Sequence, residues 1–179
     1  ADPNTHPQLW NTLTTEFGSN NAKTDSNPNI VPVSELMGKY LRLEVLSRYG
    51  KTQQLKDDII TYFLGMARQT GTLWENSKVS SASANHGFAS HVVRCLYRDI
   101  LGMKEIDNEN KIIKLKFTDI DLQWCYGEIP MREDNLKLKW KKQKDKLFYK
   151  ADIPSDYKLE IENCTDLQLV STSKSFECR

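Results

Sequence analysis

One polar loop contains the residues of this chain whose types and spacing best suit chemistry. Residues 69–91 are too small and polar to form core, yet they contain the pair Trp74 and Glu75 and, ten residues later, Asn85 and His86. Long loops between rigid elements are where binding and catalytic side chains usually lie. A carboxylate beside an indole, with a histidine returning across the loop, suits general base catalysis. We therefore take Glu75 as a candidate base and the other three as candidate ligand contacts.

Each of these residues also has an ordinary structural interpretation. A glutamate in a loop is by default a solvated charge, and Trp74 can instead plug the loop into a helical core. His86 directly precedes Gly87 at a predicted helix start, where it can form a capping hydrogen bond. His91 falls on the polar face of that helix and is interpreted as a surface residue. The residue types alone leave these alternatives open.

Other common site patterns are absent from the sequence. It contains no GxGxxG, GKS or HExxH run, so nucleotide binding and zincin chemistry have no support. It also lacks Gly-x-Ser-x-Gly, the commonest serine hydrolase signal. The four cysteines form no CxxC pair, so we expect thiols without a metal site. No cofactor is implied.

Strongly periodic helices flank the loop. The pattern predicts a helix over roughly 35–49, with Ser34 as N-cap and Gly50 as its stop. Thr52 begins a second helix, and a third is expected from about 87 to 101. The apolar positions of the second helix recur at helical spacing: Leu55, Ile59, Tyr62 and Met66. The loop therefore has anchored ends.

The apolar faces of these helices are unusually wide. The 35–49 helix has apolar residues on most sides and must be buried by neighbours on more than one face. Burying a leucine-sized side chain stabilises a fold by about 1.5–3 kcal/mol, and an exposed one does not contribute this free energy. We therefore expect the helices to be part of a larger helical domain and the chain to be a segment of a longer protein.

From Lys104 the apolar period changes from helical spacing to alternation. Ile113, Leu115 and Phe117 alternate with polar residues, as do the apolar residues of 136–140 and 157–161, and Leu167 to Val170 adds a further strand. The run 143–146 predicts a hairpin. Six or seven short strands in this region predict an antiparallel β-sandwich. The fold class is therefore α+β, with residues 1–103 as a helical domain and 104–179 as the sandwich.

The charge distribution limits the partners. The formal net charge is +1 and no long apolar run occurs, so neither nucleic acid nor a membrane span is expected. Residues 136–150 nevertheless contain seven lysines against Asp145, with Trp140, Phe148 and Tyr149 interleaved. Such a patch can bind nucleic acid or an acidic polysaccharide. We favour a solvated sheet face, because 15 basic residues balance 15 acidic ones over 104–179.

Three ordered segments resemble a known family. They are the runs 40–50 (Tyr-Leu-Arg-Leu-Glu-Val-Leu-Ser-Arg-Tyr-Gly), 71–75 (Gly-Thr-Leu-Trp-Glu) and 85–91 (Asn-His-Gly-Phe-Ala-Ser-His). Together they are similar to the C-terminal part of bacterial α-L-rhamnosidases, inverting glycoside hydrolases built on an (α/α)6 toroid. The run 96–102 and the strands after Lys104 resemble the exit from that toroid and the β-sandwich that follows. The resemblance spans nearly the whole chain.

The resemblance implies a function. It makes Glu75 the general base that activates water, with His86 contacting rhamnose and Trp74 lining the subsite. An inverting enzyme needs a second carboxylic acid about 6.5–9.5 Å away. In the family that acid precedes the matched segment, so the chain would hold half of a catalytic pair. The alternative is a non-catalytic module that binds carbohydrate or packs between domains.

The resemblance also implies partners and a location. The expected partners are a rhamnosylated glycan or glycoside and the remainder of the parent catalytic domain. Relatives that degrade polysaccharides are commonly exported, which implies a periplasmic or secreted protein.

Overall fold

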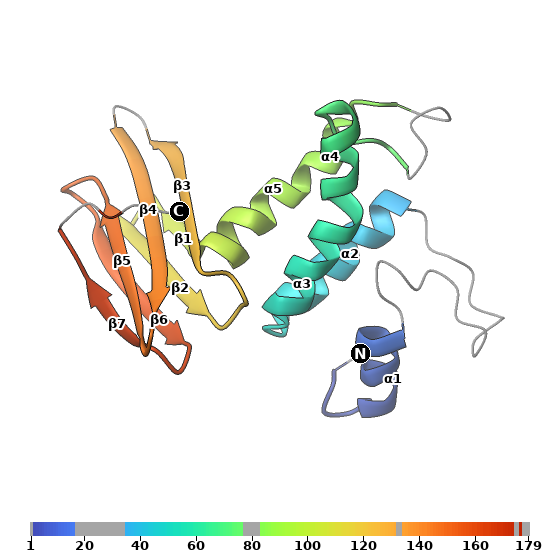
Figure 1. Ribbon diagram of the computed structural model, residues 1–179, viewed down its shortest axis with the longest axis horizontal. Coiled ribbons are helices and arrows are strands. Elements are labelled where there is room, and N and C mark those ends of the chain that lie inside the picture. Colours follow the sequence, from blue (N-terminus) through green and yellow to red (C-terminus); the bar gives the residue numbers. More distant parts are fainter. Residues whose placement is uncertain (1, 17–34, 77–82, 132–133, 174–175, 177–179) are drawn as a thin grey trace. The chain divides into compact units, whose positions relative to one another are not determined.

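The protein is described by a computed structural model that covers residues 2–16, 35–76, 83–131, 134–173 and 176 (Figure 1). Two compact units are present, Ala1–Val92 and Val93–Arg179. The first is helical and the second is built mainly of strands. Helices and sheets together confirm the α+β class. The expected cap Ser34 lies outside the described residues.

Short helical segments make up the first unit. The chain forms α1 (Pro7–Asn11) and the π-helical turn η1 (Thr12–Glu16), and then α2 (Glu35–Arg48). The next elements follow one another without a break: α3 (Thr52–Ile59), π-helical η2 (Ile60–Leu64) and α4 (Gly65–Thr70). Gly50 adopts a left-handed φ of 68° between α2 and α3, a conformation that glycine reaches without Cβ strain. The first two predicted helices are confirmed.

Apolar side chains and one ion pair hold α2 against α3. Leu43 and Leu46 of α2 and Leu55 of α3 are fully buried. Arg42 donates from Nε to Asp58 over 2.5 Å, and both side chains are about 10% exposed. Arg42 also donates to the Leu13 carbonyl, so the same guanidinium connects the N-terminal turn η1 to the α2–α3 pair. A buried pair of this kind is costly to break once it is formed.

The predicted third helix is built from three consecutive segments. They are the 3-10 turn η4 (Gly87–Ser90), α5 (His91–Cys95) and π-helical η5 (Leu96–Leu101). Gly102 ends it with a φ of 97°. A Cβ at Gly102 would lie 2.6 Å from the Lys116 carbonyl oxygen, so both the conformation and the close approach require glycine. The two units meet within α5, whereas the boundary expected after residue 103 rests on periodicity and stays a prediction.

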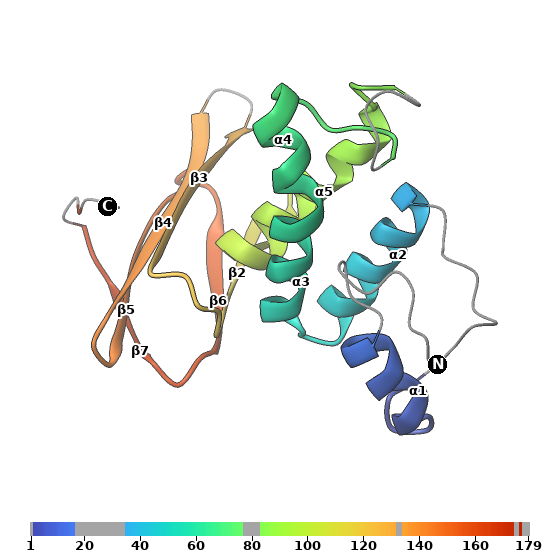
Figure 2. The same ribbon diagram turned by 45° about the vertical axis from the view of Figure 1, so that its right-hand side comes forward.

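Two sheets form the second unit, and Figures 1 and 2 show them as separate layers. The first has the order β1 (Met103–Asp107), β2 (Ile112–Thr118), β6 (Lys158–Cys164). The second has the order β3 (Trp124–Met131), β4 (Asp134–Gln143), β5 (Lys146–Asp152), β7 (Gln168–Ser171). The hairpin expected over 143–146 joins β4 to β5 and is confirmed.

The expectation of a purely antiparallel arrangement is wrong. β2 pairs with β6 in parallel, and β5 pairs with β7 in parallel. The reason is connectivity. A tight hairpin forces its two strands to be antiparallel, as in β4–β5, but the chain passes from β5 to the other sheet as β6 and returns as β7. β6 therefore pairs with β2, and β7 pairs with β5, without a hairpin between the two strands of either pair.

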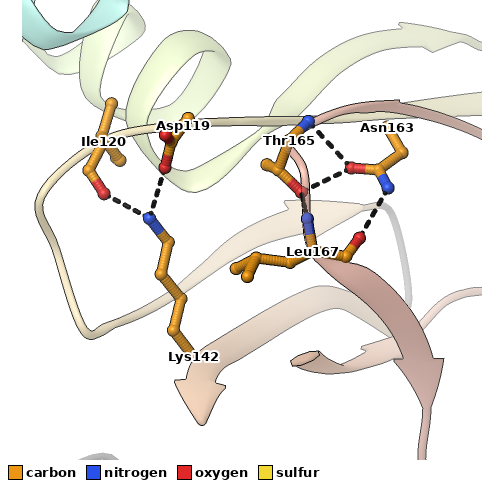
Figure 3. A network of polar contacts seen from close by, with 6 residues as sticks. All are labelled: Asp119, Ile120, Lys142, Asn163, Thr165 and Leu167. Carbon is orange, nitrogen blue, oxygen red and sulfur yellow. Dashed lines mark hydrogen bonds and ion pairs between the residues drawn. The ribbon is translucent and has the colours of Figure 1, made fainter. Parts of the chain in front are cut away.

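Asn163 organises the link between β6 and β7 (Figure 3). Its Oδ1 accepts from the backbone N–H and the hydroxyl of Thr165 at 3.0 and 2.8 Å, and its Nδ2 donates to the Leu167 carbonyl at 2.9 Å. Side-chain amides commonly hold tight turns in this way. The turn brings the chain out of one sheet and into the other.

The inward faces of the two sheets meet in one core. The rings of Phe117 and Tyr149, from different sheets, are 5.3 Å apart. Trp140 is buried and donates its Nε1–H to the Leu101 carbonyl at 2.9 Å, which ties η5 to the four-stranded sheet. The other core side chains of the described strands are Met103, Ile113, Leu115, Leu136, Leu138 and Leu147. The alternation read from the sequence therefore assigns the inward positions of β2 and β4 correctly.

Candidate functional site

The candidate loop begins where α4 ends. Gly71 takes a left-handed φ of 74° directly after Thr70, which terminates the helix. The Thr70 hydroxyl accepts from the indole Nε1–H of Trp74 at 2.7 Å and lies 2.7 Å from the Thr72 hydroxyl. The Trp74 side chain is buried, at 4% exposure. The tryptophan therefore anchors the first limb of the loop to the end of the helix.

Backbone hydrogen bonds join the two limbs of the loop. The His86 N–H donates to the Leu73 carbonyl at 2.8 Å, and the Glu75 N–H donates to the Ser83 carbonyl at 2.9 Å. The Thr72 hydroxyl adds a bond of 2.5 Å to the Ala84 carbonyl. These contacts place residues 71–76 beside residues 83–86. Glu75 and His86, eleven positions apart in sequence, thereby become neighbours.

The carboxylate of Glu75 faces both solvent and His86. Its Oε2 accepts from the Ser83 N–H at 3.2 Å and lies 4.0 Å from Nδ1 of His86. The two side chains are 49% and 34% exposed. The distance is too long for a direct hydrogen bond and leaves room for a bridging water or hydroxyl. A half-exposed carboxylate beside an imidazole has the access that a general base needs to reach a water molecule.

Of the other two predicted ligand contacts, Asn85 is exposed and Trp74 is buried. Asn85 is exposed, and its backbone N–H lies 3.4 Å from the Ser83 hydroxyl. Trp74 is buried with its N–H satisfied by Thr70, which favours the loop-anchor interpretation for this residue. Contact of Trp74 or Asn85 with a sugar stays a prediction.

His91 is half-buried, so the surface interpretation holds only in part. Its ring lies 5.0 Å from that of Tyr40 and 5.8 Å from those of Phe63 and Phe88. Nδ1 lies 3.1 Å from the Phe88 carbonyl, which can only accept, so Nδ1 carries the proton. Burial lowers the pKa of His91, although the Phe88 carbonyl and the charge of Glu44 act in the opposite direction. The helix therefore packs one side of His91 against aromatic rings and leaves the side chain partly exposed.

Sequence reasoning missed the polar residues that hold this loop. Thr70, Thr72 and Ser83 set the positions of Trp74 and Glu75 through the bonds given above. The signal was available in the Thr-Gly-Thr run at the helix end, because threonine hydroxyls commonly bond to nearby backbone at such turns. Over the described ranges, no group of three His, Cys, Asp or Glu residues is placed to hold a metal ion.

Comparisons with known proteins find one structural likeness. No known family profile matches the chain, and no curated protein matches it by sequence. The crystal structure of a GH78 family rhamnosidase of Bacillus sp. GL1 superposes with a TM-score of 0.76 at 17% identity, over 96% of this chain and 18% of that protein. The likeness shows the fold. The chain therefore corresponds in fold to less than a fifth of that protein.

Proposed function

We propose that this chain is the base-bearing segment of a glycoside hydrolase that removes terminal α-L-rhamnose with inversion. Glu75 is the general base and takes a proton from the water that attacks the anomeric carbon. His86 binds the sugar beside it, and Trp74 positions Glu75 by holding the loop on the helix end. The proposal is carried by the Glu75–His86 pair on a segment that shares its fold with the Bacillus rhamnosidase.

The general acid belongs to another part of the parent protein under this proposal. Inversion requires an acid that protonates the leaving oxygen on the opposite side of the sugar from the base. The exposed apolar residues of the helical unit support the existence of such a part. Four large apolar side chains of this unit are 44–54% exposed: Met37, Leu41, Ile60 and Phe88. Their exposure forgoes hydrophobic stabilisation that burial against further protein would provide. The remainder of the catalytic domain is the partner that would cover them.

Kinetics of the full-length parent protein test the proposal. With 4-nitrophenyl α-L-rhamnopyranoside as substrate, E75Q is expected to lower kcat by about 10²–10⁴-fold with little change in KM, because general base catalysis contributes that much. H86A is expected to raise KM more than it lowers kcat. The exposed Glu109, in the turn after β1, offers E109Q as a matched control that leaves both constants unchanged. Proton NMR of the first product should show the β-anomer, the result of inversion.

The rival interpretation is a non-catalytic module that holds carbohydrate or packs between domains. An E75Q parent with unchanged kcat would favour that module, whereas lost turnover with retained sugar binding favours catalysis. In the described part of the chain, no helix is long and apolar enough to cross a membrane. Export to the periplasm or the medium belongs to the proposal and would be tested by fractionating the source cells.

A further inference from the structure

A chain of hydroxyl groups connects the two limbs of the Glu75 loop, residues 71–76 and the return limb 83–86. The Trp74 indole nitrogen lies 2.7 Å from the Thr70 hydroxyl, which in turn lies 2.7 Å from the Thr72 hydroxyl. The Thr72 hydroxyl lies 2.5 Å from the Ala84 carbonyl oxygen. The chain therefore runs from the buried indole, past the end of α4, to the return limb (Figure 1).

The chemistry of its ends fixes the direction of each bond in this chain. An indole N–H can only donate, and a carbonyl oxygen can only accept. The single hydroxyl proton of Thr72 is donated to the Ala84 carbonyl, so Thr72 must accept from Thr70. Thr70 accepts from Trp74 in its turn, and its contact with the Met66 carbonyl is longer, at 3.4 Å. Both hydroxyls thus donate and accept, an arrangement in which each bond strengthens the next.

The chain ends on the residue that lies between the two partners of the Glu75 carboxylate. Ser83, directly before Ala84, accepts from the Glu75 N–H and donates its own N–H to the carboxylate. His86, two residues after Ala84, faces that carboxylate at 4.0 Å. A displacement of Ala84 therefore moves both groups that define the surroundings of Glu75.

Burial distinguishes Thr72 from Thr70. Trp74 is 4% exposed, so without the Thr70 hydroxyl its indole N–H would be buried without an acceptor, which is destabilising. Ala84 lies at an exposed position, where water can replace Thr72 as the donor to its carbonyl. Such an exchange changes stability little. The Thr72–Ala84 bond therefore contributes more to the position of the return limb than to the stability of the fold.

We propose that Thr72 is a positioning residue for Glu75 and His86 and that it acts through the Ala84 carbonyl. The inference rests on the proposed function of Glu75 as a general base. A general base must lie within hydrogen-bond reach of the water from which it takes a proton. Thr72 contacts neither that water nor the sugar. It holds the return limb so that the carboxylate and the imidazole face the same point.

Kinetics of the full-length parent protein with 4-nitrophenyl α-L-rhamnopyranoside test the proposal. T72V keeps the branched shape and removes the hydroxyl, and it is expected to lower kcat by about 10- to 100-fold, because small displacements of reacting groups have effects of this size. KM should rise as well, because His86 moves with the limb. T72S keeps the hydroxyl and should restore most of kcat. T14V is the matched control, since the Thr14 hydroxyl bonds to carbonyls of its own N-terminal segment.

A double-mutant cycle tests whether Thr72 acts through Glu75. In the E75Q parent the base is already lost, so T72V should lower kcat little further. Thermal unfolding adds a comparison with T70V, which leaves the buried indole N–H without its acceptor and should lower Tm more than T72V does.

Hydrogen exchange of the parent measures the limbs without substrate. The amides of Glu75 and His86 donate across the loop, so faster exchange at both in T72V, and not in T14V, is the expected sign of a displaced return limb.

The outcomes separate this inference from the proposed function. An E75Q parent with unchanged kcat overturns both. If E75Q lowers kcat, the positioning role alone is overturned by any of four results. These are unchanged kcat or unchanged exchange in T72V, no recovery in T72S, an equal loss of kcat from T72V in the wild-type and E75Q backgrounds, or a loss of Tm in T72V as large as that in T70V.

Discussion

The two units expose their large apolar side chains in different settings. In the helical unit they are mostly aliphatic, as at Met37, Leu41 and Ile60, on helices whose other faces are already packed. The two-sheet unit exposes the aliphatic Val93, Leu96 and Ile161 as well, but its most exposed large apolar side chain is the aromatic Tyr126, which pairs with Lys139 across β3 and β4. Aliphatic faces are normally covered by protein, whereas exposed rings edged by charge suit a polar ligand. The exposed aliphatic face of the helical unit is the surface that the proposed remainder of the catalytic domain would cover.

The largest stability effect should come from the buried ion pair of the helical unit. D58A leaves the Arg42 guanidinium buried without its carboxylate, and breaking such a pair costs about 3–5 kcal/mol. R42M/D58L, which removes both charges, should recover most of that loss. Urea denaturation followed by circular dichroism measures both. If D58A lowers the free energy of unfolding by less than about 1 kcal/mol, the pair behaves as a surface salt bridge. The pair would then contribute little to the stability of the helical unit.

A core truncation contrasts the two units directly. Leu138 is fully buried between the sheets, so L138A should lower the free energy of unfolding by about 2–5 kcal/mol. Leu41 is 54% exposed, so L41A in the same chain should change the free energy of unfolding by less than about 0.5 kcal/mol. If the proposed remainder of the catalytic domain covers this face, L41A should become markedly destabilising in the full-length parent. Equal effects of L41A in segment and parent would remove the argument for a covering domain.

A glycine at the start of the sheets should be sensitive to a single methyl group. G102A places a Cβ 2.6 Å from the Lys116 carbonyl oxygen at a φ of 97°, so β1 and β2 must separate or the backbone must change. We expect a loss of about 1–3 kcal/mol, the usual range for strained backbone positions. G50A shares the positive φ but has open space around its Cβ, which makes it the control for steric contact. Thermal unfolding of both variants separates the two causes: G50A reports the backbone strain of positive φ alone, and the additional loss in G102A reports the steric clash with the Lys116 carbonyl.

The smallest effect is a difference in pH response. Because the pKa of His91 lies below its ordinary value of 6.5, the unfolded chain takes up the proton first, and the helical unit loses stability as pH falls below about 6.5. In the two-sheet unit, hydrogen bonds from Lys116 and Cys164 lower the pKa of Glu162 from its ordinary value of 4.5. That contribution is present above pH 4.5 and is lost only in more acidic solution.

Amide hydrogen exchange at several pH values checks this difference unit by unit. H91Q should flatten the loss of protection in the helical unit between about pH 7 and pH 5, because the titrating ring is gone. The two-sheet unit of the same sample is the internal control. An unchanged slope in H91Q would assign the pH response to another group.

Much of the secondary structure was predictable because it depends on local pattern. Helical spacing located α2 and the start of α3 at Thr52, and alternation assigned the inward residues of β2 and β4. Gly50, which the sequence predicts as a helix stop, adopts positive φ, as does Gly102 at the end of η5. β3 was missed, because its outward positions include the apolar Trp124 and Tyr126 and its inward positions include Gly127, so hydrophobic and polar residues do not alternate along it.

The candidate site was predictable only as a set of residues. The polar run between two helices pointed to Glu75 and His86, and backbone bonds across the loop bring their side chains to 4.0 Å. The hydroxyl of Thr70, which buries the Trp74 indole, belongs to a residue with no obvious chemical role in the sequence. Its importance depends on where the helix ends.

The sequence by itself determined the helical and strand segments, the turn glycines and the loop that carries Glu75, because each depends on neighbours within a few positions. Tertiary structure alone decided the parallel pairing of β2 with β6, the packing of His91 against aromatic rings and the pairing of Trp124 with Lys141. The physical reason is that periodicity reports which side of an element faces the core. It carries no information on which distant element lies alongside.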